Sequence, residues 1–123
     1  MSGDKYLLDT NSILYILSGD KIIANHLNQK ILYASIISEI ELFGYRDLTS
    51  KQEKNIKGFL SNFRIISIDE AIKIEAIDLR KKFYLKLPDC IIAATAITLN
   101  LTLITSDKQF RQVNNLLLEL YEP

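Results

Sequence analysis

The sequence predicts an α/β fold with three layers, in which helices cover both faces of a mainly parallel central sheet of four to five strands. Short apolar runs typical of strands alternate with segments of helical spacing along all 123 residues, in the order β-α-α-β-α-α-β-α-α-β-α-β. The first strand-like run, Tyr6 to Leu8, lacks polar alternation, as expected of a strand buried on both faces. The length suits one core, so we expect a single domain over residues 1–123.

The first predicted strand ends in a carboxylate. Tyr6, Leu7 and Leu8 lead into Asp9, the capping types Thr-Asn-Ser follow at 10–12, and the apolar spacing over 13–17 suits a helix. Ligands of open parallel sheets bind outside the carboxyl ends of the strands. Asp9 is therefore the first candidate site residue.

Gly19-Asp20 indicates a break, after which helical spacing from Ile22 predicts a second helix up to about Gln29. A strand from Ile31 to Ala34 follows it. His26 lies in that helix without a second His or Cys at ligand spacing, so we interpret it as structural. Ser35 is the expected N-cap of the next helix, which we expect to end at Gly44.

The helix after Ser35 carries two candidate carboxylates, Glu39 and Glu41. Each lies about 100° from the centre of the apolar stripe on a helical wheel of ~100° per residue, so periodicity does not select between them. The stripe consists of Ile36, Ile37, Ile40 and Phe43.

The middle of the chain predicts a polar helix over 49–62, a strand over 64–68 and a helix capped by Asp69. The expected inward side chains of that last helix are Ile72, Ile74, Ala76, Ile77 and Leu79. Basic residues follow at Arg80, Lys81, Lys82 and Lys86. They either complement the helix C-terminus or form a rim that faces phosphate.

Pro88-Asp89 opens the most apolar helix, which runs to Asn100, and Asp89 is its only charged residue. The helix dipole alone would favour an acid in this first turn. A short strand over 101–105 then leads to Asp107, which repeats the arrangement at Asp9. The last strand is expected over 116–120.

Asp9, Asp89 and Asp107 each lie at the edge of an apolar element, and parallel topology with right-handed crossovers brings such places to one rim. Carboxylates gathered there repel one another unless a cation neutralises them. A ligand set of oxygens alone suits Mg²⁺ or Mn²⁺, which activates water for attack on a phosphodiester. Each acid taken singly also has a capping explanation.

The chain carries 15 basic and 15 acidic residues, so no overall positive field attracts nucleic acid. The single cysteine, Cys90, lies among apolar residues and is interpreted as buried and structural. No apolar run reaches the ~18 residues of a membrane span. Met1 to Asp4 lacks the start of a signal peptide, so we expect no membrane partner and a cytoplasmic location.

Four motifs resemble those of the PIN-domain ribonucleases, specifically the VapC-type toxins of toxin-antitoxin pairs. They are Y-L-L-D-T-N at 6–11, S-E-I-E-L-F-G at 38–44, K-L-P-D-C-I-I-A-A-T-A at 86–96 and L-I-T-S-D-K-Q-F at 103–110. The resemblance implies a PIN-like fold with an acidic quartet of Asp9, Glu41, Asp89 and Asp107. It implies that Glu39 is peripheral and that Asn11 and Thr105 support the metal by hydrogen bonds. Gln109 departs from the acid that many relatives have there, which leaves a second metal in question.

The function implied by the resemblance is a Mg²⁺- or Mn²⁺-dependent endoribonuclease that acts as a toxin, is restrained by a cognate antitoxin and forms a homodimer. The alternative is an inactive module of the same fold that docks a basic peptide or RNA. A nucleotide-binding Rossmann or receiver domain would need a Gly-rich turn or an acid pair with a downstream Lys, and the turn after the first strand has no glycine. The candidate RNA-binding rim is Arg46, Lys82, Lys86, Lys108 and Arg111.

Overall fold

The computed structural model describes residues 4–123 and centres on a five-stranded sheet in the order β3-β2-β1-β4-β5. Every neighbouring pair of strands is parallel, which confirms the predicted α/β class. The strands are β1 (Lys5–Leu8), β2 (Ile31–Ser35), β3 (Phe63–Ile66), β4 (Thr102–Thr105) and β5 (Leu118–Leu120).

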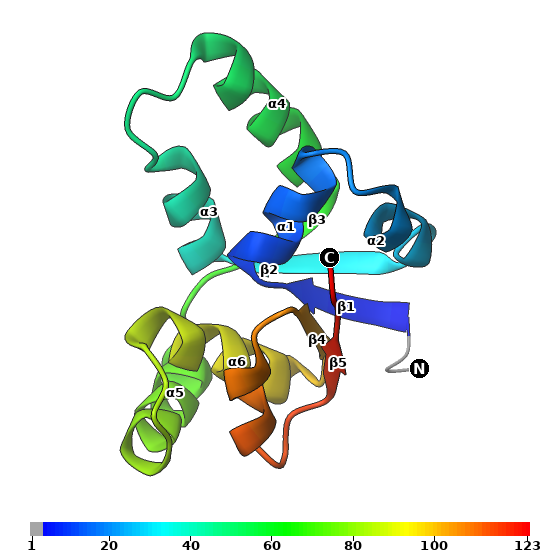
Figure 1. The fold of residues 1–123 in the computed structure, drawn as a ribbon. Coiled ribbons are helices and arrows are strands. Elements are labelled where there is room, and N and C mark those ends of the chain that lie inside the picture. Colours follow the sequence, from blue (N-terminus) through cyan, green and yellow to red (C-terminus); the bar gives the residue numbers. More distant parts are fainter. Residues whose placement is uncertain (1–3) are drawn as a thin grey trace.

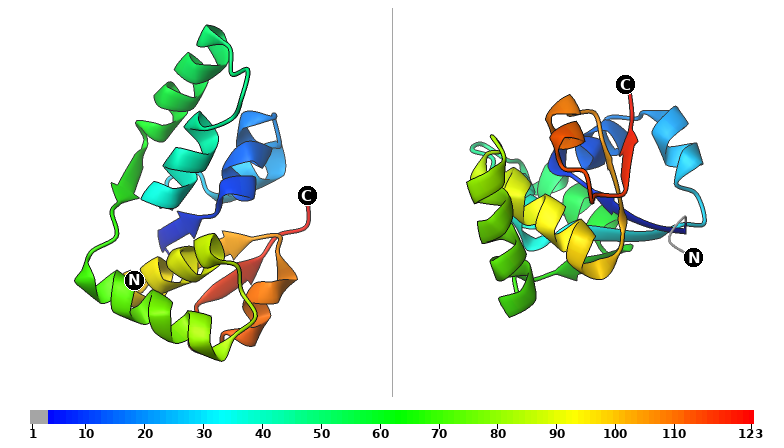
Figure 2. Two further views of the ribbon diagram at one scale, coloured as in Figure 1. Left: turned by 90° about the vertical axis from the view of Figure 1, so that its left-hand side faces the viewer. Right: turned by 90° about the horizontal axis from the view of Figure 1, so that it is seen from below.

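The helices form an outer layer on each side of the sheet, with α1 to α4 on one face and α5 and α6 on the other (Figures 1 and 2). They are α1 (Thr10–Leu17), α2 (Lys21–His26), α3 (Ile36–Phe43), α4 (Ser50–Leu60), α5 (Glu70–Lys82) and α6 (Leu87–Leu99), and a 3₁₀ segment, η2 (Lys108–Gln112), joins β4 to β5. No helix in residues 4–123 is long and apolar enough to cross a membrane.

The central strands bury both faces, which explains their continuous apolar runs. Successive side chains of a strand point to opposite faces. Leu7 therefore packs with α5 and α6, whereas Leu8 packs with the helices of the other layer. Both are fully buried. Cys90 is also fully buried within the layer that holds Leu7, as predicted.

Local capping sets where the helices begin. Ser35 and Asp69 cap α3 and α5 as predicted, and each side chain accepts a backbone N–H from the first turn of its helix. Thr49 and Gln52 form a reciprocal capping box at the start of α4. Gly44 ends α3, as its position predicted.

Two apolar side chains of α5 are not inward as expected. Ile74 is 59% exposed and Ile77 49% exposed, whereas Ile72, Ala76 and Leu79 are buried. The buried residues follow i, i+4, i+7 spacing, so the two other isoleucines fall on the outer side of the helix. The apolar character of these isoleucines alone therefore does not indicate which face of α5 packs against the core.

Several element boundaries differ from the prediction. Helix α2 ends at His26 rather than near Gln29, since Leu27 is its C-cap, and Gln29 beyond the cap takes a left-handed conformation with φ of 64°. Strand β3 ends at Ile66 rather than at residue 68, and β5 begins at Leu118 rather than at residue 116. These shifts leave the order of elements unchanged.

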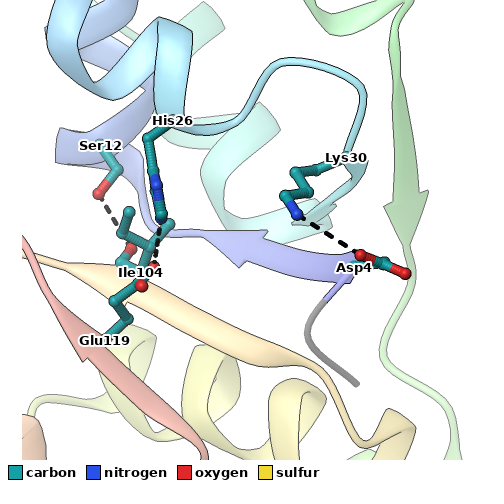
Figure 3. A network of polar contacts seen from close by, with 6 residues as sticks. All are labelled: Asp4, Ser12, His26, Lys30, Ile104 and Glu119. Carbon is teal, nitrogen blue, oxygen red and sulfur yellow. Dashed lines mark hydrogen bonds and ion pairs between the residues drawn. The ribbon is translucent and has the colours of Figure 1, made fainter. Parts of the chain in front are cut away.

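Polar contacts join β4 and β5 to the helices α1 and α2 (Figure 3). The buried Ser12 hydroxyl of α1 donates to the Ile104 carbonyl of β4 at 3.0 Å. His26 of α2 lies 2.9 Å from the Glu119 carboxylate of β5, and its ring meets Tyr6 edge-on. His26 therefore has a structural partner, as its isolation in the sequence suggested.

Candidate metal centre

The four predicted acids line one cavity of about 640 Å³ at the carboxyl ends of the strands. Asp9 follows β1, Asp107 follows β4, Glu41 lies on α3 and Asp89 lies in the first turn of α6. They come from elements that are far apart in the sequence. Parallel topology brings these elements to the same edge of the sheet.

Asp9 is held firmly at the floor of the cavity. Its side chain is 7% exposed, and Oδ1 accepts the Ser12 backbone N–H at 3.0 Å, so Asp9 itself is the N-cap of α1. We had expected the cap among residues 10–12. The Oδ2 atom accepts the hydroxyl of Thr105 at 2.5 Å. A buried carboxylate with two donors stays in one orientation.

Thr105 connects the two carboxylates that follow strands. While its hydroxyl donates to Asp9, its oxygen accepts the backbone N–H of Asp107 at 3.0 Å. Asp107 in turn caps η2 by accepting the Gln109 N–H at 2.9 Å. On the other side of this loop, the Tyr15 hydroxyl lies 2.8 Å from the Ser106 hydroxyl. The loop that carries Asp107 is therefore fixed at both ends.

Glu41 is more exposed than Asp9, and Thr10 orients it. The Thr10 hydroxyl donates to Glu41 Oε1 at 2.6 Å and lies 2.9 Å from the hydroxyl of the buried Ser38. A hydroxyl has one proton, so Thr10 can donate to the carboxylate and accept from Ser38 at the same time. Such a chain of hydrogen bonds fixes one oxygen of Glu41 and leaves the other free.

Asp89 experiences the charges of the other three acids. Burial first, and then the carboxylates of Asp107, Asp9 and Glu41, raise the pKa of Asp89 from 3.8 to about 6, while Lys86 acts in the opposite direction. The start of α6 also favours a negative charge at this place. The raised pKa shows that repulsion and desolvation outweigh the favourable contributions.

The donor set fits a hard divalent cation in its chemistry, because all of the acidic ligands offer carboxylate oxygens. The electrostatics agree, since a cation would offset the repulsion that raises the pKa of Asp89. Within residues 4–123, however, no three acids, histidines or cysteines are arranged as a ready metal-binding group. The four carboxylates nonetheless line one cavity, so the residues present fit such an ion in chemistry and charge.

The sequence matches the PIN domain family model over residues 6–116. The chain belongs to the PIN-domain family. No curated protein matches it. Among solved structures it resembles a toxin-antitoxin complex from Klebsiella pneumoniae, with 32% identity, a TM-score of 0.82, and coverage of 96% of this chain and 99% of that one.

Two further structures of VapBC complexes resemble this PIN domain. VapBC2 from Rickettsia felis, bound to a DNA fragment from its promoter, gives 25% identity and a TM-score of 0.83 over 96% of this chain and 99% of that one. VapBC-1 from nontypeable Haemophilus influenzae gives 27% identity and a TM-score of 0.80, with coverage of 94% of this chain and 97% of that one. The structural neighbours are VapC toxins of toxin-antitoxin complexes, as the sequence motifs predicted.

Asn11 and Glu39 differ in their relation to the PIN-domain cavity. Asn11 lines it but is exposed, and its side chain forms no hydrogen bond with the described residues. Glu39 is not among the lining residues, whereas its neighbour Ile40 lines the cavity and is 61% exposed. Ile40 was expected in the buried stripe, and the residues that α3 buries are Ser38 and Leu42.

The five basic residues predicted at the rim do not gather at one place. Lys86 lines the acidic cavity itself. Lys82 lies with it in a neighbouring cavity, where it pairs with Asp78 at 3.0 Å. Arg46 lines another cavity, between α1 and α4. Lys108 and Arg111 are exposed on η2 beside Asp107.

Sequence reasoning did not assign a role to Thr10 or Ser38. A usable signal was present, because Ser38 and Glu41 are three residues apart and so share a face of α3. A polar pair on a face next to the predicted site indicates a contact with another polar residue. Thr10, directly after Asp9, supplies that contact.

Proposed function

We propose that this PIN domain is an endoribonuclease that depends on Mg²⁺ or Mn²⁺ and acts as the toxin of a toxin-antitoxin pair. The observation that carries the proposal is the meeting of Asp9, Glu41, Asp89 and Asp107 in one cavity of a VapC-like fold. The raised pKa of Asp89 supports it, since this site concentrates negative charge at a cost in stability.

Asp9, Asp89 and Asp107 would hold the cation, with Glu41 as a fourth ligand or as the group that orients a ligand water. The cation would supply a water of lowered pKa and neutralise charge on the scissile phosphate. The supporting residues then keep the ligands in place. Thr105 fixes Asp9 relative to Asp107, and Thr10 fixes Glu41.

The side chains of the cavity also set the charge that an RNA phosphate would meet. Asp9 is buried and accepts two hydrogen bonds, from the Ser12 N–H and the Thr105 hydroxyl, which fix its orientation in the cavity. Lys86 lies on the same cavity and offsets part of the negative charge that an RNA phosphate would meet. The 2′-hydroxyl of the RNA has no required part in this reaction, because water is the nucleophile.

The proposal includes an antitoxin and a second copy of the chain. The related structures are toxin-antitoxin complexes, some of them bound to DNA. An antitoxin segment with a basic side chain would complement the acidic cavity and block it. For the homodimer, an apolar groove between α5 and α6 offers Ile68, Ile77, Leu87 and Ile91. Sedimentation of the Ile77→Glu variant against the parent chain tests that interface.

The test of activity is RNA turnover by purified, partner-free protein. We expect cleavage of RNA in Mg²⁺ or Mn²⁺, no cleavage in EDTA, and recovery when the ion is restored. The inactive binding module predicts RNA or peptide binding without turnover in any of these buffers. Absence of cleavage across several RNA substrates with both ions would reject the nuclease proposal.

A further inference from the structure

A basic loop adjoins the acidic cavity. The name covers residues 80–86, which comprise the last turn of α5 and the connection to α6 and contain four cations and no acid, in a chain whose net charge is zero. These residues line a cavity of about 630 Å³, and Lys86 lines both this cavity and the acidic one. The two cavities are therefore neighbours.

The helix dipole accounts for the three cations at the end of α5 but not for Lys86. Lys86 is the N-cap residue of α6, where the dipole disfavours a cation, and it makes no side-chain capping bond. Its charge acts on Asp89 across the acidic cavity. Among the described residues neither Lys81 nor Lys86 forms an ion pair.

The loop holds an aromatic ring in the open. Tyr84 is 96% exposed, the largest exposure among the exposed large apolar residues of the described chain. Its backbone is anchored, because the Tyr84 N–H donates to Gln112 Oε1 at 3.2 Å and Arg80 donates to the Leu85 carbonyl. The loop thus lies beside η2 (Figure 2). A fixed backbone presents the ring to solvent at little further entropic cost.

We infer that the basic loop binds the RNA strand beside the cleavage site, with an unpaired base stacked on Tyr84 and phosphates at Lys81 and Lys86. An exposed aromatic ring between cations is the arrangement by which proteins bind single strands without reading their sequence. Lys108 and Arg111, three apart and eclipsed on the 3₁₀ segment, extend the positive surface along η2. The inference rests on the proposed function and narrows its substrate to single-stranded RNA.

Fluorescence anisotropy of a labelled short single-stranded RNA, in EDTA so that no turnover occurs, tests the inference. We expect Tyr84→Ala to weaken binding at least about fivefold and Tyr84→Phe to bind like the parent chain. Lys81→Ala should reduce the salt dependence of log K by about 0.7. Lys54→Ala, which removes another exposed charge, from α4, should have a smaller effect on both measures.

Three results would overturn the inference: equal binding by Tyr84→Ala and the parent chain, equal effects of Lys81→Ala and Lys54→Ala, or tighter binding of duplex than of single-stranded RNA.

A polyglutamate peptide that binds in a Tyr84-dependent manner, when RNA does not, would assign the loop to an acidic protein partner. If the parent chain cleaves RNA and the Tyr84→Ala variant cleaves it at the same rate, the nuclease proposal remains intact. Tyr84-dependent binding without any cleavage would reject the nuclease and support the RNA-binding loop.

Discussion

The two sides of the acidic cavity treat their carboxylates differently. On the side of β1 and β4, Asp9 is buried and accepts hydrogen bonds from Ser12 and Thr105. On the side of α6, Asp89 is half-buried, and burial and the charges of the other acids raise its pKa to about 6. The first side fixes a ligand before any ion is bound, and the second concentrates the repulsion that an ion would relieve.

This difference predicts the largest effect at Asp9. Asp9→Asn should reduce RNA cleavage on the order of 10³-fold, because a metal contributes several kcal/mol of charge stabilisation. The amide oxygen can still cap α1, so unfolding by urea should show a loss below about 1 kcal/mol. Growth arrest on expression should be relieved. A well-folded Asp9→Asn protein that cleaves at the parent rate would exclude Asp9, and with it the side of β1 and β4, from the mechanism.

Glu41 and Glu39 provide a matched pair on one helix. Glu41→Gln should lower cleavage about 10- to 100-fold, because the side chain lines the cavity and Thr10 orients it. Glu39→Gln should change the rate less than about twofold, since it removes a charge outside the cavity. The measurement is the cleavage rate at saturating Mg²⁺. Equal losses of cleavage rate in both variants would mean that the total negative charge of α3, and not the position of Glu41 in the cavity, supports the reaction.

Thr105→Val keeps the shape of the strand and removes the hydroxyl that joins Asp9 to Asp107. We expect a drop of about tenfold in Mn²⁺ affinity by calorimetry, because residues that orient metal ligands typically contribute 10- to 100-fold. Thr102→Val, at the other end of β4, serves as the control. If both substitutions lower the Mn²⁺ affinity equally, the loss comes from a general disturbance of the strand β4 and not from the missing hydrogen bond.

The smallest predicted effect concerns Asp89 and pH. Its pKa is higher in the folded chain, about 6, than the ordinary 3.8, so the folded state binds the proton more tightly. Stability from this group is full below about pH 4 and is lost as the pH rises towards and through 6. In EDTA at pH 7.5, Asp89→Asn should therefore be more stable than the parent by about 1 kcal/mol, after allowance for solvent screening.

Urea unfolding of both proteins at two pH values checks this prediction. The advantage of Asp89→Asn should disappear near pH 4, where the parent carboxyl is protonated. Adding Mg²⁺ at pH 7.5 should stabilise the parent more than the variant. An advantage of equal size at both pH values would show that the amide packs better and that charge repulsion is not the cause.

The sequence was informative where chemistry coincides with an element boundary. Asp9 and Asp107 follow apolar strands, so topology alone predicted that they share an edge. Glu41 was different, because periodicity placed Ile40 in the buried stripe, and Ile40 is in fact exposed. The contacts that distinguish Glu41 from Glu39 come from Thr10 on another helix. Tertiary contacts of this kind leave little trace in the local pattern.

The proposed function requires that Asp9, Glu41, Asp89 and Asp107 together bind a hard divalent cation. Titration of metal-free protein with Mn²⁺ by isothermal calorimetry tests this binding without any RNA. We expect saturable binding that is abolished or strongly weakened in Asp9→Asn and retained in Glu39→Gln. Absence of binding by the parent chain, or unchanged binding by Asp9→Asn, would contradict it.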